Sequence, residues 1–476
     1  MVDVCDKLHC EKLHINSVEL SFVDDIVDRI NMDLYLDDNY VGLVSDGHGN
    51  ITTKRLPKVF QDHGVVKVDH VGIFEQEKEV TIPYITTFTK TPKVFINLLF
   101  SLTSEGGNNA RYIRSSIIDL NSNNATIASY FKTNKLNTLL VSDVSETKCV
   151  NLHYSGYGIV VNDGKALLFI NNQSFDGKGP YQYHTIINDV ANPRGYSSIL
   201  SVDGYPMIAY SRKENNHLIL GICNSLSGLG KWSMTTNNTI GLYPNLIVTE
   251  TRQVSIINYD GYNLVSSIID DGVWLSSKID PISSLTGISA CNVDKYYVMV
   301  ATKANSSSDC RVYFSDPSCT SFKLSLTSTE VWLNTDVGVL FDNRPVVIAS
   351  SLNGIKMYYN QLVNGEGQWN SVKLTDDIPS ELVYLLLGNG DSMVAYYTDN
   401  NLVILYGNMV VGEWKTFQLG NVKNISCTNT HNGYVHIAGS SENELVSILS
   451  ANKYSFAEEI KDYLIYWYAV DTELNA

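Results

Sequence analysis

Apolar and polar residues alternate over most of the chain from residue 148 to 458, and this pattern predicts short β-strands rather than helices. Segments such as "RQVSIINYD" (252–260) and "RPVVIASS" (344–351) are apolar runs or alternations of strand length. Asp-Gly and Asn-Gly pairs separate many of them, and such pairs supply the positive φ angles that tight hairpins need. These pairs stand at 163–164, 203–204, 260–261, 353–354 and 432–433. The region is therefore predicted to be all-β.

The strands recur in units that each end with a strand beginning near an aromatic residue. Aligned on that residue, the units are spaced by 42 to 49 residues, at Tyr183, Trp232, Trp274, Phe322, Trp369, Trp414 and Phe456. A period of roughly 45 residues with four strands per unit is typical of the blades of a β-propeller. We predict a seven-bladed β-propeller over residues 146–459. Six blades with one degenerate unit is the alternative, since the Tyr183 unit carries an irregular insertion.

The recurring aromatic residue has two interpretations. It can fill the space between neighbouring blades, because a large aromatic ring buries roughly 150–250 Å². It can instead stack on sugar rings in clefts between blades, as aromatic residues do in lectin propellers, which makes four tryptophans candidate ligand-binding residues: Trp232, Trp274, Trp369 and Trp414. Three units carry Tyr or Phe in its place, and this substitution favours packing over a shared ligand.

Residues 1–75 form a separate N-terminal segment in which the pattern is less regular. The stretch "LHCEKLHINSVEL" (8–20) resembles the short strand repeats of viral fibre proteins, in which three chains wind round one axis. This resemblance implies an oligomerisation segment and a homotrimer assembled through residues 1–145 and 460–476.

Residues 76–145 carry a second pattern, with Phe88, Pro92 and Val94 followed by "YIRSSIIDL" and "ATIASYF". This part resembles the H-type lectin sandwich and its relatives in phage and viral fibres. The last strand of that pattern is missing before residue 148, and "IYWYAV" (465–470), with Trp467 and Ala469, matches it. The resemblance implies a small antiparallel β-sandwich of residues 76–145 plus 460–476, with the propeller inserted into it. The alternative is that the C-terminal segment adds a strand to the propeller.

Charge and hydropathy exclude several classes of partner. The formal net charge is -16, with 34 Lys and Arg against 50 Asp and Glu, and no basic run offers a surface for phosphates, so nucleic acid is not an expected partner. The sequence has no stretch of 18 uninterrupted apolar residues, so membrane insertion is not expected, and the N-terminus lacks the pattern of a secretory signal. Cys310 and Cys319 flank a hairpin and could form a disulfide, although reduced thiols are the default expectation.

Motifs of catalysis and metal binding are absent from the sequence. The repeated Ser-x-Asp-x-Gly-x-Thr-Trp turn of sialidases, the G-x-S-x-G elbow, the P-loop and H-E-x-x-H are not found, nor is a D-x-D-x-D loop. We therefore expect no catalytic residues, no metal and no cofactor. The 29 Tyr residues and the many Asn and Asp residues suit a surface that binds neutral sugars.

The function predicted from these features is that of a non-catalytic surface or attachment protein. It would bind a host glycan or host surface protein through the propeller, at a virion surface or in an extracellular setting. The viral element depends on the resemblance to fibres and on an Asn-, Ile- and Tyr-rich composition typical of AT-rich genomes. The alternatives are a cytoplasmic propeller scaffold that binds other proteins and, third, a divergent glycoside hydrolase.

Overall fold

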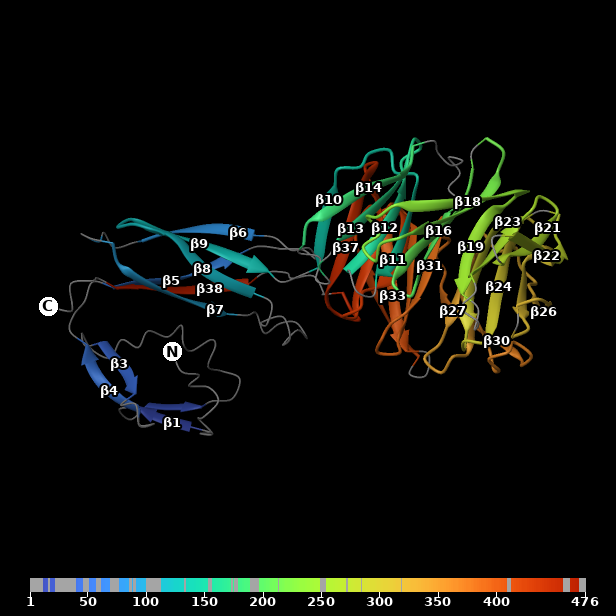
Figure 1. Cartoon of the computed structure of the whole chain (residues 1–476). Helices are drawn as coiled ribbons and strands as arrows, with labels where there is room; N and C mark the ends of the chain where they lie inside the picture. Colours follow the sequence, from blue (N-terminus) through green and yellow to red (C-terminus); the bar gives the residue numbers. More distant parts are fainter. Residues whose placement is uncertain are drawn as a thin grey trace. The chain divides into compact units, whose positions relative to one another are not determined.

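The structure is a computed structural model in which nearly every described residue of regular structure belongs to an antiparallel β-sheet (Figure 1). It describes residues 12–15, 18–21, 40–45, 51–56, 61–68, 77–84, 88, 91–99, 113–131, 134–456 and 463–470. Within 134–456, the positions 153–155, 173, 175–178, 189–196, 213, 249–253, 271–272, 284, 318 and 409–411 are not described. The chain divides into a small unit and a large one, the large one including Phe131–Lys461.

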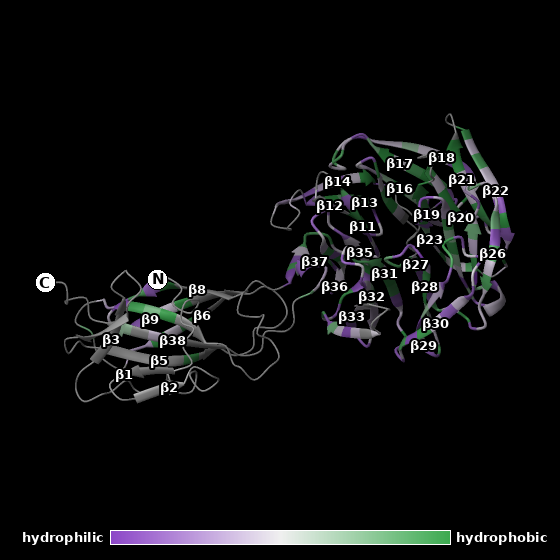
Figure 2. Ribbon diagram, turned by 90° about the horizontal axis from the view of Figure 1, so that it is seen from below, coloured by the Kyte–Doolittle hydropathy of each residue, from purple (hydrophilic) through white to green (hydrophobic). Residues whose placement is uncertain are grey.

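Seven four-stranded sheets make up the large unit, and they follow one another around a ring (Figures 1 and 2). Each blade runs from an inner to an outer strand in sequence order, except the last. Blades 1 to 3 consist of β11 (Glu146–Leu152), β12 (Gly156–Asn162), β13 (Leu167–Asn172) and β14 (Tyr181–Ile187); β15 (Ser197–Val202), β16 (Tyr205–Ser211), β17 (His217–Cys223) and β18 (Trp232–Ile240); and β19 (Leu242–Val248), β20 (Val254–Tyr259), β21 (Asn263–Asp270) and β22 (Val273–Pro281).

Blades 4 to 6 repeat this order, and a short 3₁₀ turn, η2 (Ser307–Asp309), precedes the third strand of blade 4. Their strands are β23 (Leu285–Val293), β24 (Tyr297–Ala304), β25 (Arg311–Ser315) and β26 (Phe322–Thr327); β27 (Asn334–Val339), β28 (Pro345–Ser351), β29 (Gly354–Asn360) and β30 (Trp369–Thr375); and β31 (Glu381–Leu386), β32 (Ser392–Thr398), β33 (Asn401–Asn408) and β34 (Glu413–Gln418). The seven-bladed propeller predicted from the repeat is confirmed.

Blade 7 is closed by a strand from the other end of the propeller sequence. Its sheet runs β35 (Lys423–Asn429), β36 (Tyr434–Ser441), β37 (Glu444–Lys453) and then β10 (Lys135–Leu139), which pairs antiparallel with β37. Two predictions are corrected here: β10 lies inside the range 76–145 that we assigned to the sandwich, and Phe456 follows β37 without beginning an outer strand. Without β10, the outer edge of β37 would present unpaired backbone N–H and C=O groups. Pairing with β10 satisfies these groups.

The hydrophobic core of the propeller lies between neighbouring blades. The two middle strands of each blade are mostly buried, and the second strand is almost wholly buried in β12, β28 and β36. Figure 2 shows the hydrophobic colour along these middle strands, while hydrophilic residues gather on turns and outer strands. The Gly of each of the five predicted Asp-Gly and Asn-Gly turns has a positive φ, between 78° and 99°, as the turn chemistry requires: Gly164, Gly204, Gly261, Gly354 and Gly433.

Side chains on the inner strands tie consecutive blades together by hydrogen bonds to backbone groups of the next inner strand. Such bonds run from β15 through β19, β23, β27, β31 and β35 to β11. At one junction the amide of Tyr384 donates to Asp336 Oδ2 at 2.7 Å, and at the next the amide of Ile425 donates to Glu381 Oε2 at 2.9 Å. Because an inner strand at the blade edge has unpaired backbone groups, these bonds satisfy part of them.

The small unit contains two three-stranded antiparallel sheets, and two further strand pairs precede them. The sheets have the orders β5 (Gln61–Val68), β38 (Tyr463–Val470), β7 (Lys93–Leu99), and β6 (Glu77–Pro83), β9 (Asn124–Phe131), β8 (Ile113–Leu120); the pairs are β1 (Lys12–Ile15) with β2 (Val18–Ser21), and β3 (Tyr40–Ser45) with β4 (Ile51–Leu56). The C-terminal strand β38 lies between β5 and β7, so the propeller sequence is inserted between β9 and β38. The all-β fold class with an inserted propeller is confirmed.

Aromatic residues join the two sheets of the small unit. Trp467 is 4% exposed and its ring lies 5.8 Å from that of Tyr84, which in turn lies 5.2 Å from Phe88. Phe88 and Ala469 are buried. Pro92 is also buried and Val94 is half-buried, so most positions that carry the resemblance to H-type lectins are core positions here; the resemblance itself stays a prediction.

Within the fibre-like stretch 8–20, residues 12–15 and 18–20 belong to the antiparallel pair β1–β2, and the other residues lie outside the described ones. The resemblance to fibres and the homotrimer stay predictions.

Candidate functional site

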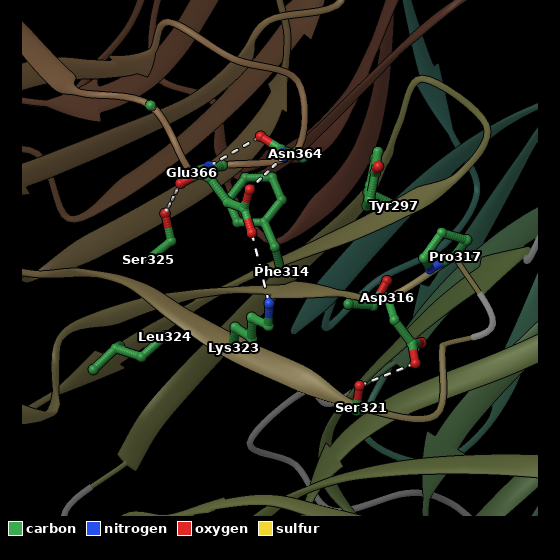
Figure 3. A pocket seen from close by; sticks show the side chains of 13 residues that line it. Tyr297, Phe314, Asp316, Pro317, Ser321, Lys323, Leu324, Ser325, Asn364 and Glu366 are labelled. Carbon is green, nitrogen blue, oxygen red and sulfur yellow. Dashed lines mark hydrogen bonds and ion pairs between the residues drawn. The ribbon is translucent and has the colours of Figure 1, made fainter.

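A cavity of 650 Å³ lies between blades 4 and 5, and Figure 3 shows the side chains around it. One wall comes from blade 4, where β25 runs into the turn at Asp316–Pro317 and β26 follows with Lys323. The other wall is the loop between β29 and β30 of blade 5, with Asn364 and Glu366. Tyr297, at the start of β24, and the buried ring of Phe314 complete the lining. We refer to this cavity as the inter-blade groove.

The loop of blade 5 is held in shape by an asparagine at the end of β29. Asn360 donates through Nδ2 to the carbonyl oxygens of Gly365 and Gly367, at 3.1 and 2.8 Å, and its Oδ1 accepts from the amide of Leu362 at 2.9 Å. The side chain therefore replaces backbone partners that the loop would otherwise lack.

Gly365 is required where the loop crosses the neighbouring blade. Its φ is 74°, and a Cβ built there would lie 2.3 Å from the ring of Phe314. The same arrangement occurs between blades 1 and 2, where Gly228 also has φ 74° and a Cβ would lie 2.1 Å from Phe169. In both loops the phrase Gly-x-Gly-x-Trp places a glycine over the phenylalanine of the preceding blade.

Polar side chains contact one another across the mouth of the groove. Lys323 Nζ lies 3.6 Å from Glu366 Oε1, and Asn364 Nδ2 donates to Glu366 Oε2 at 2.9 Å (Figure 3). On the blade 4 side, Ser321 Oγ donates to Asp316 Oδ2 at 3.0 Å. The side chains of Lys323 and Glu366 are 83% and 62% exposed, so their ion pair adds little stability and is open to a ligand. The groove thus offers acceptors on both walls and one cationic donor.

Exposed aromatic rings continue this surface toward the neighbouring turns. Tyr296, adjacent in sequence to Tyr297 of the groove, is 44% exposed, and Phe341 on the equivalent turn of blade 5 is 54% exposed. The two turns are in contact, because Asn343 Nδ2 lies 3.5 Å from Asp294 Oδ1. A polar groove beside exposed aromatic rings suits a ligand with both hydroxyl groups and apolar C–H faces.

The four tryptophans predicted as ligand-binding residues are not brought together. They lie in four different hydrophobic clusters, each between the blade that carries the tryptophan and the blade before it: Trp232, Trp274, Trp369 and Trp414. Trp232 is 8% exposed and donates from Nε1 to Gly228 O at 3.1 Å; Trp369 donates from Nε1 to Ser325 Oγ at 2.9 Å. Their packing supports a structural role, and ligand binding by them stays a prediction.

The aromatic alignment was displaced by two residues in blade 1. Tyr183 is 46% exposed, whereas Tyr181 is the first residue of β14, as Trp232 is of β18 and Trp369 of β30. The phrase Gly-x-Gly-x-aromatic at 177–181, 228–232 and 365–369 gives this alignment directly. That phrase is also the sequence signal that could have located the groove loop, since the groove residues Asp316, Lys323, Asn364 and Glu366 were not predicted.

Two ionisable groups with large pKa shifts, the half-buried Asp336 and the buried His436, lie away from the groove, between blades. Burial raises the pKa of Asp336 on β27 to about 6, while the amides of Tyr384 and Val337 donate to its carboxylate and offset part of this effect. Burial lowers the pKa of His436 on β36 to about 3. Among the described residues no group of His, Cys, Asp and Glu side chains could hold a metal ion. Cys310 and Cys319 are buried free thiols.

His436 belongs to a buried polar network that joins blade 7 to blade 1. Its Nε2 is 2.9 Å from Ser447 Oγ, and its ring lies over Tyr157 with the centroids 3.9 Å apart. Ser447 Oγ is 3.0 Å from the hydroxyl of Tyr181, which is 2.8 Å from that of Tyr157 and accepts from Asn137 Nδ2 of β10 at 3.2 Å. The network therefore connects the closing strand to both blades at the junction.

Comparison with known proteins finds no matching family model and no matching curated protein. Solved structures that resemble this one include virginiamycin B lyase from Staphylococcus aureus, with 12% identity and a TM-score of 0.48 over 66% of this chain and 99% of that chain. The Swd1 β-propeller domain from Myceliophteria thermophila has 9% identity and a TM-score of 0.45 over 66% and 98%. YCF48 from Cyanidioschyzon merolae has 11% identity and 0.45 over 67% and 98%.

Among the described residues, no helix has the length and apolar character that crossing a membrane requires.

Replacing Trp232 tests the packing role of the recurring aromatic residue. Trp232→Ala should lower the free energy of unfolding by roughly 3–5 kcal/mol, because it leaves a cavity between Phe169 and Gly228. Trp232→Phe should lose less, since Phe322 occupies the equivalent position of blade 4. The neighbouring exposed Lys231→Ala should stay within about 0.5 kcal/mol of wild type. Urea unfolding followed by circular dichroism measures all three, and an unchanged midpoint for Trp232→Ala would contradict the packing role.

The pKa of His436 predicts how stability depends on pH. The His436 imidazole takes up a proton near pH 3 in the folded protein but near pH 6.5 in the unfolded chain. The contribution of the neutral His436 to the unfolding free energy is therefore fully present above pH 6.5 and decreases as the pH falls toward 3. When the pH is lowered from 7.5 to 4.5, the wild type should lose about 2–3 kcal/mol more unfolding free energy than His436→Phe. The loss accumulates over the two pH units between 6.5 and 4.5, at about 1.4 kcal/mol per unit. Urea unfolding at both pH values measures this double difference, and equal pH dependence in the two proteins would disprove a buried neutral His436.

Proposed function

We propose that this chain is a non-catalytic binding protein whose propeller takes a glycan in the inter-blade groove. The observation that carries the proposal is the groove itself, with Asp316 and Lys323 on one wall, Asn364 and Glu366 on the other, and Tyr297 in the lining. Carboxylate and amide oxygens accept hydrogen bonds from sugar hydroxyls, the lysine donates to them, and an aromatic ring faces a C–H surface. A polar rim beside exposed rings is therefore matched to a carbohydrate.

A binding role is preferred to a catalytic one because both groove carboxylates are held by neighbours. Glu366 is bound by Lys323 and Asn364, and Asp316 by Ser321 and Thr320. Hydrolysis of a glycosidic bond asks for a pair of carboxyl groups with opposite tasks, one a proton donor and one a base or nucleophile. Carboxylates that already accept hydrogen bonds from neighbouring side chains can still accept further hydrogen bonds from sugar hydroxyl groups, as in a lectin.

The wider proposal is that the protein is a surface or attachment protein, and that its ligand lies on a host glycan or a host surface protein. The homotrimer, the virion or extracellular location and the resemblance to H-type lectins belong to this proposal and depend on the sequence. The alternatives, a cytoplasmic scaffold and a divergent glycoside hydrolase, differ from it in whether glycan is bound at all and in whether it is consumed.

A glycan array with the labelled full-length protein tests the proposal, followed by calorimetric titration of the strongest ligand. The double variant Asn364→Ala and Glu366→Gln should bind that ligand at least tenfold more weakly, because two hydrogen-bond acceptors of the groove are altered. Lys231→Ala, in the equivalent loop of blade 2, should bind as wild type does. Binding of no glycan, or equal binding by the double variant, would refute the groove as a glycan site. Conversion of the glycan by wild type, lost in Glu366→Gln, would establish hydrolysis in its place.

A further inference from the structure

The two faces of the propeller carry different connections between strands. In each blade, the connections from the first to the second strand and from the third to the fourth strand lie on one face, which we call the proximal face. The connections from the second to the third strand, and from the fourth strand to the first strand of the next blade, lie on the opposite face, which we call the distal face. The chain enters β10 after Asn134 and leaves β37 toward Phe456 on the proximal face, where Asn134 Oδ1 accepts from the amide of Ala451 at 3.1 Å.

The most exposed large apolar side chains of the described propeller are all on this distal face. Leu140 is 98% exposed, Tyr262 79% and Leu352 78%, each at the tip of a connection. The turn around Tyr262 is formed by Asp260, whose Oδ1 accepts from the amides of residues 262 and 263, so the fold makes no use of the tyrosine ring. Single exposed apolar residues are common on protein surfaces, and a contiguous apolar patch is what marks a binding site.

Leu352 belongs to a continuous patch over blade 5, which also contains Val331 and Ile378, 39% and 48% exposed. Two contacts show that its parts adjoin. Ser351 Oγ, next to Leu352, donates to Glu330 Oε2 at 2.6 Å, next to Val331. On the other side the turn lies against the segment before Ile378, because a Cβ on Gly354 would be 2.9 Å from the Cα of Asp376.

Charge decides which occupant this patch suits. Among the described residues of the distal connections, ten are acidic and two are basic: Asp143, Asp163, Glu214, Asp260, Asp309, Glu330, Asp376, Asp377, Asp399 and Glu442, against Lys165 and Arg212. Strand lysines partly neutralise the patch, since Lys356 pairs with Glu330 and Lys373 with Asp376. Glu330 remains ionised, because its hydrogen bonds from Lys356 and then Ser351 lower its pKa. The field over the patch stays negative.

We propose that the distal face over blade 5 docks a basic segment of another protein, with apolar side chains seated on Leu352, Val331 and Ile378. Lysine or arginine residues of that segment face the surrounding carboxylates. A second copy of this chain is disfavoured as the occupant, because a net charge of -16 makes two acidic faces repel each other. This inference stands apart from the glycan groove, which lies on the proximal side of blades 4 and 5.

Binding of synthetic peptides to the full-length protein tests the proposal by fluorescence anisotropy. The probe is a labelled 12-residue peptide with four lysines and four leucines spaced by serines. A peptide with serine in place of leucine and one with glutamate in place of lysine should each bind at least tenfold more weakly. Binding of the first peptide should also weaken as salt is raised, because part of the attraction is between charges.

Paired variants locate the binding to the patch. Leu352→Ser with Ile378→Ser should weaken the lysine–leucine peptide at least tenfold. Leu275→Ser with Val372→Ser, on outer strands, should leave it unchanged, and Leu275 is matched to Ile378 by the same 48% exposure. The groove variant with Asn364→Ala and Glu366→Gln should also bind the peptide normally, which separates this test from that of the glycan site.

Three results would overturn the proposal. The first is equal affinity for the leucine-free peptide, which would reduce the effect to charge alone. The second is unchanged binding by the Leu352→Ser and Ile378→Ser variant. The third is self-association of the wild type in sedimentation velocity that this variant abolishes, which would make the patch an interface between copies of the chain.

Discussion

The pairing of β10 with β37 is the constraint on which the rest of the propeller depends. A ring of blades is held together only if its first and last members are joined, and here the outer strand of the last blade is supplied from the sequence before the first. Hydrogen bonds from inner-strand side chains then carry the connection from blade to blade. The buried network of Tyr157, Tyr181, Ser447 and His436 secures the junction itself. With the ring closed, loops from neighbouring blades are held at fixed distances, and grooves between them become possible.

The recurring aromatic residue has its explanation in the same geometry. Blades in a ring diverge toward their outer strands, and in blades 1 to 6 a large ring at or next to the start of the outer strand fills the widening gap. Tyr181, Phe322 and Phe456 occupy inter-blade clusters as the four tryptophans do. The position therefore requires a large aromatic side chain and is not restricted to tryptophan. The groove uses this packing indirectly. Trp369 holds Ser325, and Phe314 supports Gly365, so the polar side chains above them have a rigid floor.

The sequence predicted what local chemistry determines. Turn glycines, strand periodicity and the count of seven units were visible because each depends on residues close in the chain. The displacement from Tyr181 to Tyr183 arose because both residues are aromatic and residues two positions apart on a strand point to the same face, so strand alternation does not distinguish them. The role of β10 could not be seen, since its partner lies more than 300 residues away.

The groove could not be predicted from the sequence, because its walls come from two blades and its residues form no recognisable motif. Lys323 and Glu366 are 43 positions apart, and only the ring places them 3.6 Å from each other. The raised pKa of Asp336 is likewise a product of tertiary burial and not of its neighbours in sequence. The N-terminal resemblance to fibres and the H-type lectin pattern reach further toward function than the structure does, and they remain predictions.

Hydrogen–deuterium exchange with bound glycan tests the central claim most directly, since it reports where on the propeller the ligand is held. The account predicts slower exchange at residues 321–325 and 364–367 when glycan is added, with little change at the starts of β22 and β34, which carry Trp274 and Trp414. Protection at β22 and β34 without protection at the groove would contradict it, and would return binding to the recurring tryptophans.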